Sequence, residues 1–253
     1  MEAALRAASA RSEGVIFIGG QGNAVVPGIA ADHPGTGFAV VQGDVTGPNL
    51  ASYDVLQEQS AFLAGCLAAR LTGTGVVAHL SGHRVKPGLK GRAAFVAGVR
   101  HLLPEVTVLT GFCGTQDDTG IARTWAEAQI KAGADILFTM LNAARPGAVD
   151  ACRDAGRRQI GNALDWCAID PAVFVGSALA RIDLAVERTA RDMLAGRPAR
   201  VHRIGLSDGD AVALSLAPDV PKAVADEMDR LRQALERGDI TVPATYEGAE
   251  FTP

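Results

Sequence analysis

The stretch Ser60-Ala-Phe-Leu-Ala-Gly-Cys66, followed by Val76-Val-Ala-His-Leu80, decides the fold predicted for this chain of 253 residues. Ser60 is a residue type that caps helices, and Thr72-Gly-Thr-Gly75 is typical of a helix end. The run after these glycines is rich in β-branched and apolar residues, which favours a buried strand. The apolar positions that share one face of the helix are Phe62, Leu63, Cys66, Leu67 and Leu71. A helix that leads directly into a strand is the repeating unit of α/β folds.

The same alternation continues along the whole chain and predicts a parallel α/β architecture. The expected strands are Val15–Ile18, Phe38–Val41, Tyr53–Leu56, Val76–Leu80, Val106–Leu109, Ile136–Met140, Gln159–Gly161 and Val173–Val175. With so many strands and no flexible linker, we expect two interleaved lobes that the chain crosses near residues 73–75 and 165–177. The first lobe would hold residues 1–73 with part of 179–253, the second residues 74–178, and a ligand cleft would lie between them.

Composition excludes several classes of partner. The net charge is −4, the pI is about 5.7, and Lys and Arg are scattered, so we expect no nucleic-acid partner. The four cysteines have no C-x-x-C spacing and lie in or beside apolar segments, which predicts free, mostly buried thiols rather than a metal site. We expect no cofactor.

The amino terminus predicts where the chain as written resides. Met1-Glu-Ala-Ala-Leu-Arg6 lacks a basic start followed by an apolar run, so it is not an export signal, and a cytoplasmic location is expected. Leu63-Ala-Gly-Cys66 matches the form of a lipoprotein cleavage site, but it lies deep in a helical pattern. If an amino-terminal leader has been lost, the alternative is an extracytoplasmic, membrane-anchored protein.

Six short segments, in order along the chain, resemble one family of solute-binding proteins. They are Val15-Ile-Phe-Ile-Gly-Gly20, Pro34-Gly-Thr-Gly-Phe-Ala-Val-Val41, Ser60–Gly65, Gly133-Ala-Asp-Ile-Leu-Phe138, Ile160–Asp165 and Gly238-Asp-Ile-Thr-Val-Pro243. The family is that of the basic membrane proteins, which are purine-nucleoside-binding lipoproteins of ABC importers. The resemblance implies a type I periplasmic-binding fold, capture of a small polar ligand such as a nucleoside or nucleobase, and an ABC permease as partner.

The chain also departs from the family pattern at its amino-terminal side. The resemblance implies a first strand-helix-strand unit that is not found here, so the first lobe would lack its first two strands. Val15–Ile18 would then be an exposed apolar edge, which invites pairing with another chain. We expect a second copy of the chain, or a separately encoded partner, to cover this edge.

Asp165 and Trp166 are the first candidate ligand-binding residues. Asp165 follows the strand Gln159–Gly161, and open α/β sheets bind ligands at the carboxyl ends of their strands. A carboxylate there can accept hydrogen bonds from the vicinal hydroxyls of a ribose, and the resemblance implies this role. Trp166 can stack on a base or sugar. The alternatives are an Asp that caps a loop and a Trp that packs at a hinge.

Four further candidates are Asn142, Arg145, His83 and Glu58. Asn142 ends a strand before a helix start, where backbone N–H groups and the amide can meet a ligand. Arg145 can admit an acidic ligand or be a solvated loop residue. His83 can donate to the ligand or lie on a surface loop. Glu58 lies where the family has acidic residues near its ligand, and otherwise is a carboxylate at a helix start.

The turn Gly19-Gly-Gln-Gly22 supplies Gly20 and Gln21 as the last candidates. In the family this turn usually carries an aromatic residue, and Gln21 offers an amide instead. As a dinucleotide fingerprint, Gly20-x-Gly22 with Asp44 favours an NAD-dependent enzyme, but Pro27-Gly28 interrupts the expected helix.

Catalysis stays open as an alternative, because a nucleoside hydrolase-like or NAD-dependent enzyme can be derived from this binding fold. A cytoplasmic ligand sensor is a further alternative. The sequence holds no G-x-S-x-G, H-E-x-x-H or P-loop motif, and we assign no catalytic residue.

Overall fold

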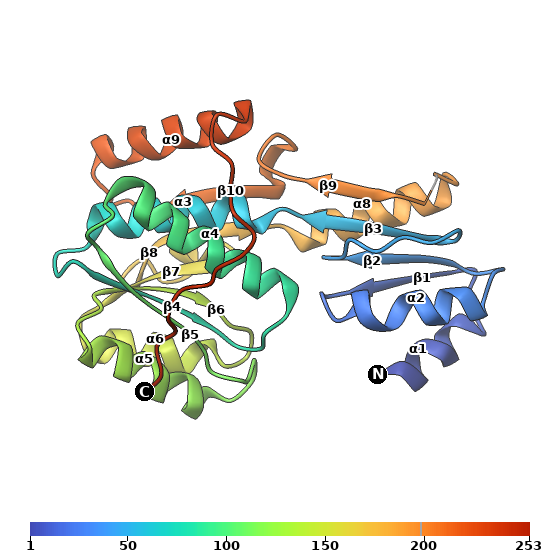
Figure 1. The fold of residues 1–253 in the computed structure, drawn as a ribbon, viewed down its shortest axis with the longest axis horizontal. Helices are drawn as coiled ribbons and strands as arrows, with labels where there is room; N and C mark the ends of the chain where they lie inside the picture. The colour runs from blue at the N-terminus through green and yellow to red at the C-terminus, as the bar shows by residue number, and fades with distance from the viewer. Residues whose placement is uncertain (198) are drawn as a thin grey trace. The chain divides into compact units, whose positions relative to one another are not determined.

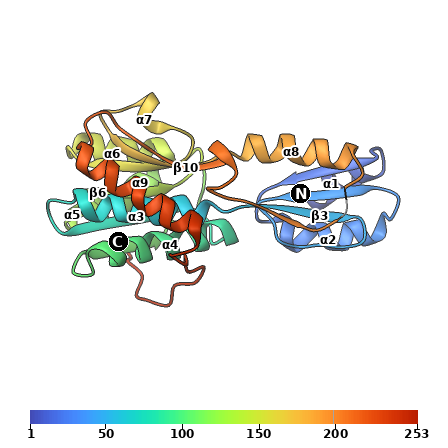
Figure 2. The same ribbon diagram turned by 90° about the horizontal axis from the view of Figure 1, so that it is seen from above.

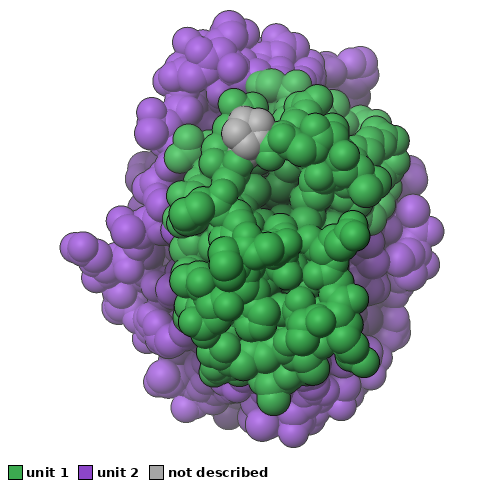
Figure 3. All heavy atoms as spheres, turned by 90° about the vertical axis from the view of Figure 1, so that its right-hand side faces the viewer, with its two compact units in different colours: residues 1–56, 181–211 green, residues 57–180, 212–253 purple. Residues whose placement is uncertain are grey.

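The computed structural model describes residues 1–197 and 199–253, and these form two compact units. Unit 1 holds residues 1–56 and 181–211, and unit 2 holds residues 57–180 and 212–253, as Figure 3 colours them. These boundaries differ from the predicted lobes. The reason is helix α3 (Gln57–Leu71), which packs against elements of unit 2, so the chain leaves unit 1 before this helix and not after it.

Unit 1 is built on four parallel strands in the order β1-β2-β3-β9 (Figure 1). Its elements are α1 (Glu2–Ser9), β1 (Gly14–Ile18), α2 (Gly22–Asp32), β2 (Gly37–Val41), β3 (Leu50–Val55), α8 (Ile182–Leu194), β9 (Val201–Ile204) and the short 3-10 helix η1 (Gly209–Ala211). Figure 2 shows the sheet between α8 on one side and α2 on the other. Buried side chains of α1, α2 and the sheet form the core on the α2 side: Leu5, Val26, Ile29, Ala30, Phe38, Val40 and Leu50.

Unit 2 is built on six strands in the order β10-β8-β7-β6-β4-β5, all parallel except β10. Its strands are β4 (Val76–Ser81), β5 (Thr107–Phe112), β6 (Ile136–Met140), β7 (Arg158–Ala163), β8 (Phe174–Ala180) and β10 (Val212–Leu216). Its other helices are α4 (Lys86–Leu102), α5 (Thr119–Lys131), α6 (Arg145–Asp154), α7 (Trp166–Ile169) and α9 (Lys222–Arg237). In Figure 1, α3, α4 and α9 cover one face of the sheet and α5 and α6 cover the other.

The Ser60–Cys66 stretch folds as it does because two helices meet through glycines. A side chain on Gly65 of α3 would come within 2.1 Å of the Phe95 carbonyl, and one on Gly98 of α4 within 2.0 Å of the Phe62 carbonyl. Only hydrogen fits at both positions, so the two backbones lie in direct contact. Ser60 is not the helix cap. The helix begins at Gln57, and the buried Ser60 hydroxyl bonds to the Gln57 and Leu179 carbonyls.

The eight predicted strands are confirmed as β1 to β8. Helix α2 runs through Pro27, contrary to the interruption expected there. Pro27 is the sixth residue of this helix, so the missing N–H removes only the bond to the Asn23 carbonyl. Strands β9 and β10 were not predicted. Within residues 1–197 and 199–253, no helix is long and apolar enough to span a membrane.

The last residues of the chain, 239–253, form an irregular C-terminal segment that belongs to unit 2. It descends over α4 and ends near α5 (Figure 1). The Phe251 N–H donates to the Thr110 carbonyl of β5 at 2.8 Å, and the Phe251 ring meets Trp125 of α5 edge-on at 6.4 Å. The chain therefore covers the outer edge of β5 with its own terminus.

Candidate functional site

The topology of unit 2 places a switch point between β4 and β6. From β4 the chain passes through α4 to β5 on one side, and then through α5 on the opposite face to β6 on the other side. Open α/β sheets bind ligands outside the carboxyl ends of the strands at such a point. His83 follows β4 and Asn142 follows β6, and both side chains are exposed. The two predicted residues therefore flank the switch point.

Gln116, which the sequence analysis did not select, holds the loops around this point together. Its side-chain oxygen accepts from the Asn142 N–H at 3.1 Å, and its carbonyl accepts from the Ala144 N–H at 2.8 Å. A side chain on Gly82 would come within 2.5 Å of the Gln116 amide carbon. The loops after β4, β5 and β6 thus fit against one another. The only sequence signal is its place shortly after a strand, beside Asp117 and Asp118.

Asp165 is exposed at the carboxyl end of β7, where it caps α7. Its Oδ1 accepts from the Ser215 hydroxyl at 2.8 Å and from the Ala168 N–H at 3.4 Å. These bonds orient the carboxylate and use two of its roughly four acceptor positions. The loop-capping interpretation and the ligand-binding interpretation are therefore compatible, because one oxygen performs the capping.

Trp166 and Arg145 pack on each other. The Arg145 guanidinium lies 4.4 Å from the centre of the Trp166 ring, and the indole N–H donates to the Asn162 carbonyl at 2.9 Å. Arg145 is buried and donates to the Leu141 carbonyl at 2.6 Å and the Thr139 hydroxyl at 3.0 Å. Burial lowers the pKa of Arg145 to about 10, so it stays charged at neutral pH. A solvated loop arginine, the alternative from the sequence, is wrong.

Glu58 is buried in the first turn of α3 and forms an ion pair with Lys90 of α4 at 2.7 Å. Both side chains are about one-tenth exposed. This pair ties the amino-terminal end of α3 to α4. A role of Glu58 in ligand binding stays a prediction.

Gly20 and Gln21 belong to unit 1 and follow β1. The Gly20 carbonyl accepts from the Asn23 amide at 3.1 Å, and the Asn23 side-chain oxygen accepts from the Asp44 N–H at 3.0 Å. Asn23 thereby joins the turns that follow β1 and β2. Gln21 is exposed at the start of α2. The predicted ligand residues thus divide between the two units, with Gly20 and Gln21 in unit 1 and the other six in unit 2.

Two strained residues mark the carboxyl edges of both sheets. Among the described residues, Gln42 after β2 (φ 67°) and Ala163 at the end of β7 (φ 71°) are the non-glycine positions with left-handed backbone. Such conformations cost about 1–3 kcal/mol and cluster at functional sites. They point to the same edges as the predicted residues do.

A buried polar chain supports the end of β4. His79 Nδ1 lies 2.9 Å from the Thr110 hydroxyl, and His79 Nε2 lies 2.8 Å from the Ser81 hydroxyl. Burial, together with the nearby charge of Arg92, lowers the pKa of His79 to about 3. The imidazole is therefore neutral, with one nitrogen as donor and the other as acceptor. Sequence analysis missed this chain because His79 lies inside an apolar strand.

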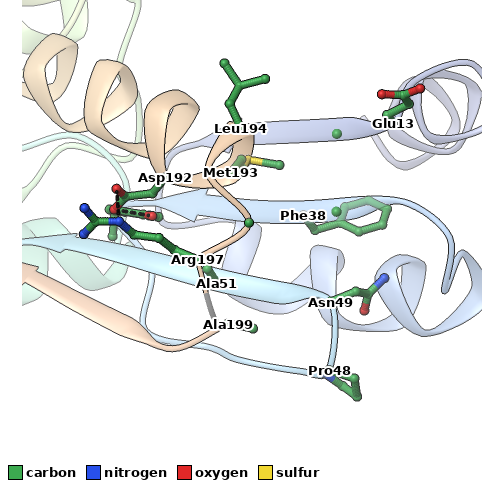
Figure 4. A pocket seen from close by; sticks show the side chains of 14 residues that line it. Glu13, Phe38, Pro48, Asn49, Ala51, Asp192, Met193, Leu194, Arg197 and Ala199 are labelled. Atoms are coloured by element: carbon green, nitrogen blue, oxygen red, sulfur yellow. Dashed lines mark hydrogen bonds and ion pairs between the residues drawn. The ribbon is translucent and has the colours of Figure 1, made fainter.

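A pocket of about 580 Å³ lies elsewhere, at the amino ends of β1 to β3 and beside the end of α8 in unit 1 (Figure 4). Asp192 at its wall accepts from the Tyr53 hydroxyl at 3.0 Å and pairs with Arg197 at 3.1 Å. Burial, and then the bond to Asp192, raise the pKa of Tyr53 to about 12. Apolar groups of Phe38 and Met193 complete the wall. None of the predicted site residues lines this pocket.

The four cysteines are free, as predicted. Cys66, Cys152 and Cys167 are buried and Cys113 is half-buried. Burial raises the pKa of each thiol, to about 12 for Cys66 and about 11 for Cys152. These thiols are poor nucleophiles at neutral pH.

Comparison with known proteins gives consistent matches. The family described as ABC transporter substrate-binding protein PnrA-like matches residues 2–244. Basic membrane protein D of Borreliella burgdorferi is 26% identical over 160 residues, which are 61% of this chain and 47% of that protein. A purine-binding protein of Brucella abortus is 22% identical over 143 residues, which are 56% of this chain and 40% of that protein.

Among solved structures, a solute-binding protein of an ABC transporter system from Aeropyrum pernix superimposes with a TM-score of 0.86. The two are 19% identical, and the match covers 97% of this chain and 81% of the other. This similarity confirms the predicted α/β fold of the type I periplasmic-binding class. The chain spans about half the length of the curated relatives it matches.

Proposed function

Because the chain belongs to the family of PnrA-like substrate-binding proteins of ABC transporters, we propose that it captures a nucleoside-like ligand at the carboxyl edge of the unit 2 sheet. Asp165, Asn142 and His83 supply the polar contacts in this proposal. Each of the three side chains is exposed at the end of a parallel strand, where α/β folds bind small molecules.

The observation that carries the proposal is the orientation of Asp165. Ser215 and Ala168 hold one carboxylate oxygen, so the group has little freedom left to lose when a ligand arrives. A carboxylate can accept from two neighbouring hydroxyls, and a ribose presents such a pair. The Brucella relative is named as a purine-binding protein, which supports a purine nucleoside as the ligand.

Asn142 and His83 complete the polar set. The Asn142 amide can donate to and accept from a base edge, and its backbone is fixed by Gln116. The start of α6 follows within three residues and favours electronegative ligand atoms. Trp166 offers part of an aromatic surface, although Arg145 already lies over its ring.

Thermal-shift and calorimetric titrations with inosine, guanosine, adenosine, uridine, free ribose and NAD test this proposal. A ligand at a hundred times its Kd adds about 2.7 kcal/mol to the unfolding free energy, which is easily detected. We expect stabilisation by purine nucleosides, and we expect Asp165→Asn to weaken their binding at least about tenfold through loss of a charged acceptor. Asp226→Asn is the matched control, because Asp226 is an exposed carboxylate on α9.

Failure of every nucleoside to stabilise the protein would overturn the proposal. So would binding that Asp165→Asn leaves unchanged. Chromatography of the same mixtures after incubation distinguishes capture from catalysis, since products would appear only if the chain were an enzyme.

The family membership also supports an ABC permease as the partner that receives the ligand, and an extracytoplasmic place of action. Ligand-dependent stimulation of the permease ATPase in proteoliposomes tests this part. An ATPase rate that is the same with and without the ligand-loaded protein would contradict it.

The open edge of β1 supports a second copy of the chain as a further partner. Strand β1 pairs with β2 on one side, and among the described residues no strand pairs with its other side. Ile18 is 56% exposed. The edge carries no charge or proline, the features with which proteins guard exposed strands.

The strand is also complementary to itself. An antiparallel pair centred on Ile16 would place Gly14 of one copy opposite Ile18 of the other. Gly14 and Met193 both line the pocket of unit 1, and a side chain at Gly14 would come within 2.9 Å of the Met193 methyl. The Met193 methyl therefore occupies the space beside Gly14, and in the proposed pair the isoleucine of the second copy would pack against this methyl.

Sedimentation velocity at micromolar concentration tests this pairing. We expect twice the mass of the 26.1 kDa chain. A well-folded monomer, or a complex only with a different chain, would overturn it.

A further inference from the structure

Glu250 in the C-terminal segment is the carboxylate on which two arginines converge. Arg84 contacts one of its oxygens and Arg92 the other. The Arg92 side chain is only 6% exposed, so its charge depends on this partner. Arg84 lies in the loop between β4 and α4, directly after His83.

Aromatic rings hold the same guanidinium groups. Arg84 and Arg92 lie 4.8 and 5.0 Å from the centre of the Phe112 ring, and Phe112 ends β5. Arg92 also lies 4.9 Å from the ring of Tyr246 in the C-terminal segment. Cation–π contacts of this kind stabilise desolvated arginines. The cluster therefore joins the C-terminal segment to the carboxyl ends of β4 and β5.

A second connection runs through the sheet. The Phe251 N–H donates to the Thr110 carbonyl, the Thr110 hydroxyl meets His79, and His79 meets the Ser81 hydroxyl. Ser81 is the last residue of β4 and is 1% exposed. The C-terminal segment thus contacts the β4–α4 loop at two places. It reaches the first residues of the loop through the buried chain Thr110, His79 and Ser81, and it reaches the middle of the loop through Arg84.

The loop itself has few bonds of its own. The backbone hydrogen bonds of residues 82–85 run from the Gly114 N–H to the Gly82 carbonyl, from the Val85 N–H to the His83 carbonyl, and from the Leu89 N–H of α4 to the Val85 carbonyl. His83 and Arg84 are exposed. A loop with such sparse support opens readily unless side chains restrain it.

We propose that Glu250 is a positioning residue for the ligand site, because its pairing with Arg84 holds residues 82–85, and therefore His83, in place. This inference rests on the proposed function and identifies the C-terminal segment as a part of the binding site that is far from it in sequence. It does not require Glu250 to touch the ligand.

Amide hydrogen exchange of Glu250→Gln tests the proposal without any ligand. We expect residues 82–85 to exchange about tenfold faster than in the wild type, while residues 164–168 after β7 keep their rates. Glu247→Gln, three residues earlier and exposed, is the matched control. Glu250→Asp keeps the charge and should restore part of the protection. Equal rates in Glu250→Gln and Glu247→Gln would overturn the proposal.

Inosine titration adds the functional arm. We expect Glu250→Gln to raise the Kd about three- to tenfold, mainly through faster dissociation. Arg84→Met should have the same effect, and the double variant should be no worse than either single variant. An unchanged Kd, or additive effects, would contradict the proposal. If no nucleoside stabilises the wild type, the proposed function fails, and the exchange experiment alone decides the role of Glu250; if another nucleoside binds and inosine does not, the titration uses that nucleoside.

Discussion

The edge strand β5 of the unit 2 sheet is covered by another part of the chain, whereas in the described part of the chain the edge strand β1 of the unit 1 sheet is open. In unit 2, the chain returns from residue 239 onward to lay Phe251 on β5 and Glu250 on the neighbouring arginines. In unit 1, β1 presents Gly14–Ile18 with no strand of the described residues on its outer side. Both strands are apolar, so hydrophobic pattern alone does not tell a covered edge from an open one. What differs is a segment that lies far away in sequence.

Removal of residues 248–253 is expected to have the largest effect on this contrast. It leaves buried Arg92 without its carboxylate and uncovers the edge of β5 beside Trp125. We expect the unfolding free energy to fall by about 3 kcal/mol, measured by urea denaturation with tryptophan fluorescence. Removal of only Thr252 and Pro253, both exposed, is the control. A loss below about 1 kcal/mol would mean that the edge of β5 is no better protected than that of β1.

A charge on the open edge tests the other side of the comparison. Ile18→Lys should weaken the proposed pairing of two copies at least about a hundredfold, because a lysine guards an exposed strand. The stability of the single chain should change by less than about 0.5 kcal/mol, since Ile18 is 56% exposed. Ile121→Lys is the matched control, because Ile121 is 42% exposed on α5. Sedimentation velocity measures the mass of Ile18→Lys and of Ile121→Lys. The same mass for both would mean that the edge of β1 does not pair with a second copy, and would contradict the contrast between the two edges.

Local pattern predicts most of this fold and little of what joins its parts. The β-branched runs identify β1 to β8. The positions at which the chain crosses between the units cannot be read from the sequence. They depend on the assignment of α3 to unit 2, which follows from its close packing against α4 through Gly65 and Gly98. Strand β9 is short and contains Arg203, so neighbouring β3 rather than its own pattern makes it a strand.

The candidate site is predictable to the level of strand ends. Position after a strand is enough to place Asp165, Asn142 and His83 at one edge of the unit 2 sheet. It does not reveal pairings over long separations, such as Glu58 with Lys90. It also favours a solvated Arg145, whereas the Leu141 carbonyl, directly after β6, and the Trp166 ring together stabilise this charge in the interior.

Tyr53→Phe tests a buried hydrogen bond inside unit 1, for comparison with the ion pairs of the C-terminal segment in unit 2. Tyr53 loses its bond to Asp192, and we expect a cost of about 1–2 kcal/mol near neutral pH. Because folding raises the pKa of Tyr53 to about 12, its stabilising effect is complete below about pH 10 and falls as the pH rises toward 12. The variant should lack this alkaline loss. Tyr246→Phe, in the C-terminal segment, should retain it, and equal alkaline profiles for both variants would contradict the assignment.

Glu250→Gln should give the smallest effect and the opposite pH dependence. The bond to Arg84, followed by that to Arg92, lowers the pKa of Glu250 in the folded protein. A lowered carboxyl pKa contributes stability that is complete above the ordinary value of about 4.3 and is lost as the pH falls through the folded value. The wild type should therefore exceed the variant by about 1 kcal/mol at pH 6, a modest figure because Glu250 is 30% exposed. Urea denaturation between pH 6 and pH 3 should show this difference shrinking toward zero. A difference that stays constant with pH would mean that the amide loses shape complementarity rather than charge, and that the β5 edge is held by Phe251 and not by the arginine pair.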